Sequence, residues 1–206
     1  MTTDAKEDLH RYLREAREDL VWKVEGLSEH DLRRPLTPTG TNLLGLVKHL
    51  TTVELLYFGF AFGRNFAEFV PWYRPDLGPD GLPPNTDMWA TADESREYVV
   101  ELYQRVWKHS DATIEELALD ATGHVLWWPE PESRATLHRV LAHVIAEVHR
   151  HVGHADIVRE LVDGAVGLRR DDGFLPPVDE AWWEDYRNRL TLVAEQARVA
   201  EQADRN

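Results

Sequence analysis

Apolar residues recur every three or four positions in five stretches of the chain, which is the spacing of an amphipathic helix. These stretches span residues 4–27, 41–62, 93–117, 133–163 and 179–203. The segments between them are rich in proline and glycine, and no stretch alternates polar and apolar residues as a half-buried strand does. The pattern therefore predicts an all-α fold, a four-helix bundle with an additional C-terminal helix.

The stretch 133–163 is the longest helical pattern and holds five of the ten histidines. On a helical wheel with Glu147 at zero, its apolar residues form an arc centred at about 40°. His151 lies at the centre of this arc, Glu147 and His154 lie inside it, and His143 lies at its edge. Burying such groups is costly unless a partner satisfies them, and a metal ion is one such partner.

A further histidine, His49, lies on the apolar face of the stretch 41–62. If these two helices are neighbours, His49, Glu147 and His151 converge in the interior of the bundle. Residues four apart share a helix face, so Glu147 and His151 can bind one ion together. Two imidazoles and one carboxylate leave a coordination position open, which is typical of a catalytic metal site. The competing interpretation is that hydrogen bonds alone satisfy each buried histidine.

Three other side chains are candidates for facing a substrate. His154 follows His151 by three positions and is an alternative third ligand or a substrate-facing group. His143 precedes Glu147 by one turn and is a less central alternative. Trp127 belongs to a tryptophan-rich segment that either lines a pocket or packs between helices. The pattern assigns no catalytic residue.

Composition narrows the classes of partner. The net charge of −14 argues against nucleic acid and anionic membranes, which bind basic surfaces. The chain has no cysteine, which excludes disulfides, cysteine-based zinc sites and a cysteine nucleophile. The charged N-terminus does not read as a signal peptide, and no run of 18 apolar residues predicts a membrane span. We therefore expect one cytoplasmic domain over residues 1–206, acting on a small molecule.

Two motifs carry a resemblance to a known family. LVKHLTTVELLYF, followed far downstream by HVIAEVHRHVGHADIVRELVDG, resembles the DinB-like superfamily, and more narrowly its actinobacterial branch of uncharacterised proteins. The resemblance covers nearly the whole chain. It implies an up-down-down-up four-helix bundle that binds one divalent metal, often zinc or nickel, through three histidines. His49 and His151 match the first and last of these positions, and Glu147 stands where the family has its middle histidine.

The resemblance also implies a class of reaction. Relatives include S-transferases that use mycothiol or bacillithiol, and a mycothiol-dependent isomerase. We therefore expect a metal-dependent enzyme that transfers a mycothiol-type thiol to a small electrophile, with the metal activating the thiolate. A homodimer is the candidate assembly. One alternative is a non-enzymatic bundle that dimerises or binds a small ligand. Another is a hydrolase that uses metal-bound water.

Overall fold

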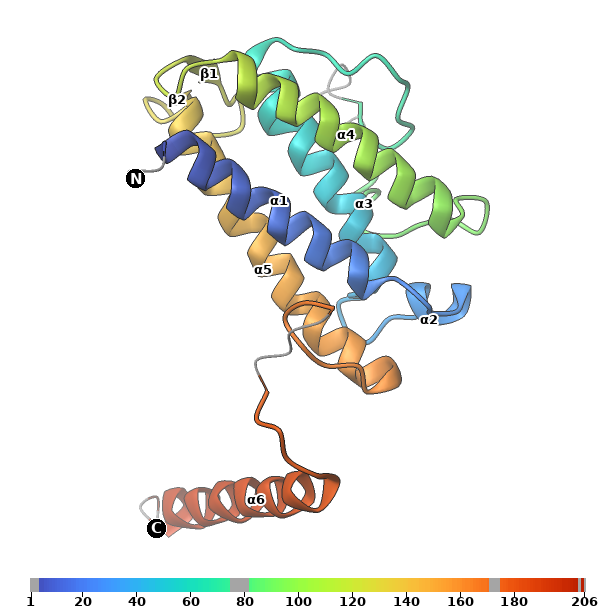
Figure 1. Cartoon of the computed structure of the whole chain (residues 1–206). Coiled ribbons are helices and arrows are strands. Elements are labelled where there is room, and N and C mark those ends of the chain that lie inside the picture. The colour runs from blue at the N-terminus through green and yellow to red at the C-terminus, as the bar shows by residue number, and fades with distance from the viewer. Residues whose placement is uncertain (1–3, 75–81, 171–174, 204, 206) are drawn as a thin grey trace. The chain divides into compact units, whose positions relative to one another are not determined.

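The computed structural model describes residues 4–74, 82–170, 175–203 and 205, and these are mostly helical. Figure 1 shows α1, α3, α4 and α5 running alongside one another. The elements are, in order, α1 (Ala5–Lys23), α2 (Glu29–Arg33), α3 (Leu43–Glu54), the π-helix η1 (Leu55–Gly59), the 3₁₀ helix η2 (Phe60–Phe62), α4 (Arg96–Glu116), β1 (Thr122–His124), β2 (Arg134–Thr136), α5 (Leu137–Asp163) and α6 (Glu180–Ala203). The predicted all-α class is confirmed, apart from two short strands.

Polar side chains cap the four long helices that precede α6, namely α1, α3, α4 and α5, at their N-termini. The side chain of Asp4 accepts a hydrogen bond at the start of α1, Asn42 does so at the start of α3, and Thr136 at the start of α5. Such caps satisfy amide groups that have no partner inside the helix. The sequence predicts a cap at Thr3 or Asp4 for the first helix and at Thr41 or Asn42 for the second. The structure uses Asp4 and Asn42.

Thr91 and Asp93 are the two caps that the sequence predicts for α4, and this prediction is wrong. The cap is Ser95, whose hydroxyl accepts from the amide of Tyr98. The Glu94 carboxylate accepts the amide of Thr91 instead, at 2.8 Å, and this bond holds residues 91–94 in a turn before the helix.

Strands β1 and β2 were not predicted from the sequence. They pair antiparallel, with Thr122 opposite Thr136 and His124 opposite Arg134. Each is only three residues long, too short for polar and apolar positions to alternate recognisably. The helix predicted from residue 133 consequently begins at Leu137.

The predicted second helix changes its winding before it ends. After Glu54 the chain forms the π-helix η1 and then the 3₁₀ helix η2. Gly63 follows in the left-handed region with φ 64°, which ends the helix. The sequence around residues 65–69 also suggests a short helical continuation, and the structure has no helix there. A π-helical turn widens the helix and changes the direction of the side chains after it.

The core draws on all four long helices. Leu13 and Leu20 of α1, Leu50 of α3, Tyr103 of α4 and Val148 of α5 are fully buried. Helix α1 packs mainly on α5, and α3 packs mainly on α4. Because α3 also contacts α5, side chains from these two helices can meet.

Two contacts fix the direction of α1 relative to its neighbours. Lys6, in the first turn of α1, donates to the carbonyl of Leu117 just beyond the end of α4, at 2.9 Å. Arg159, near the end of α5, donates to the carbonyl of Lys23 at the end of α1, at 3.0 Å. Helix α1 is therefore antiparallel to α4 and parallel to α5.

A buried polar network crosses the core. The guanidinium of Arg17 on α1 donates to both carboxylate oxygens of Glu54, at 2.9 and 2.7 Å, and both side chains are almost fully buried. A further guanidinium nitrogen of Arg17 bonds Asp111 on α4 at 2.6 Å. The network thus joins α1, α3 and α4.

The segment before α4 packs tightly on α3. Asn42 donates to the carbonyl of Met88 at 3.1 Å, and Lys48 donates to the carbonyl of Trp89 at 2.9 Å and to the Glu94 carboxylate. Gly45 faces this segment without a side chain, and a Cβ there would overlap the Met88 carbonyl. The close approach therefore requires glycine at position 45.

Residues 43–62 are, within the part of the chain that the structure describes, the one helical segment long and apolar enough to cross a membrane. The most apolar window has a mean hydropathy of 1.3, and 78% of it is buried inside the fold. Burial of this extent is what the central helix of a packed core shows, so composition here is weak evidence for a span.

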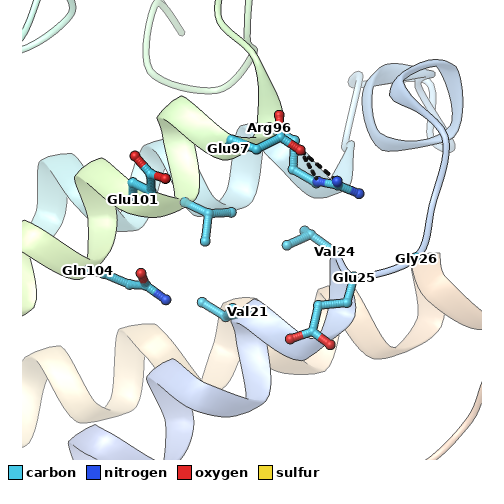
Figure 2. A pocket seen from close by; sticks show the side chains of 9 residues that line it. Val21, Val24, Glu25, Gly26, Arg96, Glu97, Glu101 and Gln104 are labelled. Atoms are coloured by element: carbon cyan, nitrogen blue, oxygen red, sulfur yellow. Dashed lines mark hydrogen bonds and ion pairs between the residues drawn. The ribbon is translucent and has the colours of Figure 1, made fainter.

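A cavity of about 340 Å³ lies between the end of α1 and the first half of α4 (Figure 2). Valines form its apolar part, and an ion pair between Arg96 and Glu97 lies at one side. It is lined by Val21, Val24, Glu25, Gly26, Arg96, Glu97, Val100, Glu101 and Gln104. None of the site residues predicted from the sequence is among them.

Residues 174–206 form a compact unit separate from residues 1–173. Its helix α6 matches the predicted range, and none of its residues is buried. The indole of Trp182 stacks on the ring of Tyr186, with centroids 5.2 Å apart.

Candidate functional site

His49 of α3 and His151 of α5 face each other. Their ring centroids are 4.8 Å apart and the rings are nearly perpendicular, at 72°. The side chain of His151 is 12% exposed and that of His49 is 25% exposed. The sequence predicts that these two histidines converge if their helices are neighbours, and the structure brings them together at a position that solvent reaches.

Glu147 lies one turn before His151 on α5, as predicted. Its Oε2 atom is 3.6 Å from Nε2 of His151. The expectation that His151 occupies the centre of the apolar face is wrong, because the buried arc extends past it through Val148 and Val152. Contacts of α5 with both α1 and α3 widen this arc. Glu147 and His151 therefore lie at the border of the core.

Asp87 is a site residue that sequence reasoning missed. Its Oδ2 atom is 2.8 Å from Nδ1 of His49, and it comes from the long connection before α4. A carboxylate behind an imidazole fixes the ring and places its proton on the nitrogen that faces the carboxylate. Nε2 of His49 is then left with a free lone pair. No periodicity marks a loop residue, so only the fold reveals this contact.

His154 lies beside His151, with the two Nδ1 atoms 3.4 Å apart, and its side chain is exposed. Burial, together with the charges of His49 and His154, lowers the pKa of His151 from 6.5 to about 4. His151 is therefore neutral near pH 7, the state in which an imidazole can ligate a metal.

An aromatic cluster lies further along α5, formed by Tyr57, Trp127, Trp128 and His143. The hydroxyl of Tyr57 accepts hydrogen bonds from the indole N–H groups of Trp127 and Trp128, at 3.0 and 3.1 Å. The ring of His143 lies 4.8 Å from that of Tyr57 and 5.0 Å from that of Trp128. Burial lowers the pKa of His143, which favours its neutral form.

The aromatic cluster and the histidine pair share one side of α5. His143, Glu147 and His151 are spaced by four residues, so they follow one another along the helix over about 12 Å. Trp127 is 41% exposed, so part of its indole is available to a ligand. His143 and Trp127, two of the predicted substrate-facing residues, thus lie together, whereas His154 lies with the histidine pair.

The donor set fits a divalent metal in its chemistry. Neutral imidazole and carboxylate are the ligands that zinc and nickel take in proteins, and Asp87 supplies the supporting carboxylate behind His49. Within residues 4–74, 82–170 and 175–203, however, no group of three or more His, Cys, Asp or Glu side chains is arranged to hold a metal ion. Metal binding at His49, Glu147 and His151 therefore stays a prediction.

Comparisons with known proteins agree with this architecture. The family model described as Mycothiol-S-transferase matches residues 8–164. A solved structure, described as a conserved protein from Enterococcus faecalis, superposes with a TM-score of 0.55 at 13% identity, covering 80% of this chain and 100% of that one. At this identity the likeness shows the fold alone. No curated protein matches the chain significantly.

Proposed function

The chain belongs to the mycothiol S-transferase family, a DinB-like family, and we propose that it transfers a low-molecular-weight thiol of the mycothiol type to a small electrophile. The observation that carries the proposal is the pairing of His49 with His151, within the family match and beside Glu147 and Asp87. The chain has no cysteine, so the reacting sulfur comes from the co-substrate.

The proposal includes the family's up-down-down-up course for α1, α3, α4 and α5. The antiparallel contact of α1 with α4 and its parallel contact with α5 support this course. In this arrangement α3 and α5 present His49 and His151 to each other.

His49, Glu147 and His151 would hold a divalent metal ion, with zinc and nickel the first candidates. When bound, the metal stabilises a thiolate at neutral pH and so supplies the nucleophile. Asp87 keeps the Nδ1 proton of His49 in place, and burial keeps His151 neutral. The sulfur forms a bond to the electrophilic carbon as the bond to the leaving group breaks. The exposed His154 accepts the thiol proton and exchanges it with solvent.

The aromatic cluster would bind the organic part of a substrate. The Trp127 side chain is 41% exposed, and the Tyr57 hydroxyl holds both indoles in place through their N–H groups. Stacking on a fixed aromatic face favours a flat or ring-shaped group. Such a group would lie on one side of Glu147, with the histidine pair on the other.

Metal analysis and a thiol-transfer assay test the proposal. Protein purified without chelator should contain stoichiometric metal and consume mycothiol with at least one of a panel of small electrophiles. His151→Ala should lose both properties. His138→Ala is the matched control, because His138 is an exposed histidine in the first turn of the same helix. Equal substoichiometric metal in all three proteins would refute the metal site, and no thiol consumption with any electrophile would refute the transferase.

A second candidate is a bundle that binds a small ligand without catalysis. The lack of a ready three-donor group among the described residues favours it. In that case hydrogen bonds satisfy His49 and His151, as the Asp87 contact already does for His49. This function predicts no bound metal and no change in melting temperature on adding a strong chelator.

A further inference from the structure

Helix α6 carries an apolar stripe with the spacing of a coiled-coil seam. The stripe residues follow one another at intervals of three, four, three, four and three, which places them at the a and d positions of a heptad. They are Trp183, Tyr186, Leu190, Val193, Ala197 and Ala200. Nothing within the described part of its own unit buries them, and Leu190 and Val193 are 52% and 61% exposed.

The sizes of the stripe residues favour a second, antiparallel copy as the partner. Reversing the stripe places Trp183 opposite Ala200, Tyr186 opposite Ala197, and Leu190 opposite Val193 of the other copy. Each large side chain then meets a smaller one, and a two-fold axis repeats each pair. A parallel pair would instead stack large residues at one end and leave alanines facing each other at the other, where packing would be poor.

The stripe leaves apolar surface for a partner to cover. Tyr186 is 39% exposed, Leu190 52% and Val193 61%, and Trp183 is half-buried. Two copies would cover this surface mutually along the seam. The antiparallel orientation also aligns the helix dipoles favourably.

Charges beside the stripe fit the same orientation. Arg187 and Glu201 flank it on one edge, at e positions, and antiparallel copies bring Arg187 within reach of Glu201 of the second copy. Within a single chain Arg187 bonds Glu180 at 2.9 Å, on the exposed surface. Exchange of one exposed partner for the other costs little.

We propose that two copies of this chain associate through α6, antiparallel, with Leu190 and Val193 at the centre of the seam. The segment lies beyond residues 8–164, so the association belongs to this chain's extension and not to the part that defines the family. It joins two separate thiol-transferase units into one particle.

Sedimentation equilibrium of the full chain tests the association. The unchanged protein should be a dimer in the micromolar range, and Leu190→Arg should be monomeric. Leu192→Arg is the matched control, because Leu192 is 58% exposed but lies on the opposite side of α6. A monomeric unchanged protein, or a dimer that survives Leu190→Arg, would overturn the proposal. Retained thiol transfer by monomeric Leu190→Arg separates this outcome from the proposed function.

A spin label tests the orientation, since the chain has no cysteine of its own. A label on Glu180→Cys, at the first residue of α6, should give an inter-copy distance of about 35 Å in the antiparallel dimer. A parallel dimer would bring the two labels to roughly the 10 Å separation of adjacent helices. The short distance would overturn the antiparallel arrangement.

Discussion

At the scale of single residues, the ion pair between Arg17 and Glu54 joins two helices inside the core. Both are almost fully buried and joined by two hydrogen bonds. Glu54→Gln leaves the guanidinium charge without its main counter-charge, and we expect it to destabilise the protein by about 3–5 kcal/mol in urea unfolding. Glu116→Gln, at a surface pair with Arg64, should cost less than about 1 kcal/mol. Equal losses of unfolding free energy in Glu54→Gln and Glu116→Gln would contradict a stabilising role of the buried ion pair.

Asp111 makes the contribution of the same network to the free energy of unfolding depend on pH. Burial acts to raise the pKa of Asp111, but hydrogen bonds and charges from His10 and Arg17 outweigh it, so the pKa is lowered. A carboxyl with a lowered pKa in the folded state stabilises the fold above its unfolded pKa of about 4, and loses this contribution as pH falls further. The free energy of unfolding of Asp111→Asn should therefore lie below that of the unchanged protein at pH 6, and the gap should narrow towards pH 3. A gap independent of pH would contradict this.

Asp87 has its effect through His49. If the site holds a metal, Asp87→Asn should weaken metal affinity by about 10–100-fold, because the imidazole loses the carboxylate that orients it. Competition with a chelating dye measures the affinity. Asp93→Asn, in the turn before α4, is a control in the same connection. Equal affinity in both variants would show that Asp87 does not support a metal ligand.

At the scale of elements, the π-helix η1 directs Tyr57 toward the tryptophans. Its hydroxyl accepts two indole N–H groups that belong to the connection between β1 and β2. Tyr57→Phe removes both bonds, and we expect a loss of about 1–3 kcal/mol together with a change in tryptophan fluorescence. Phe58→Leu, a volume change within the same element, should alter stability without altering the Trp127 and Trp128 emission. Unchanged emission in Tyr57→Phe would contradict the role of the hydroxyl.

The sequence predicts elements well where local chemistry decides them. The range of α6, the cap at Asp4 and the cap at Asn42 all follow from spacing and from side chains within one turn. The cap of α4 at Ser95 does not follow from local chemistry. Glu94 holds residues 91–94 in a turn, and its carboxylate also bonds Lys48 on another helix. The spacing of apolar residues also gives no sign that α3 continues as the π-helix η1.

At the scale of the whole molecule, the site also combines residues that the sequence predicts with residues that only the fold brings together. Proximity of Glu147 and His151 follows from their spacing, and His49 follows from its apolar face once α3 and α5 are neighbours. Asp87 could not be predicted, because it reaches His49 across 38 positions from an irregular segment. Helical periodicity also predicts more burial for His151 than the structure shows. The width of the buried face of α5 depends on how many helices α5 contacts, which periodicity does not reveal.

The missing side chain at Gly45 gives the site a dependence on a position outside it. A methyl group there would overlap the Met88 carbonyl and push away the segment that carries Asp87, one turn of α3 from His49. A random mutational screen for activity should therefore tolerate no replacement at position 45, alanine included, although Gly45 contributes no side chain to the site. Nearby positions such as Thr41 should accept substitutions. The absence of tolerated substitutions at position 45 would therefore reveal this contact from activity data alone.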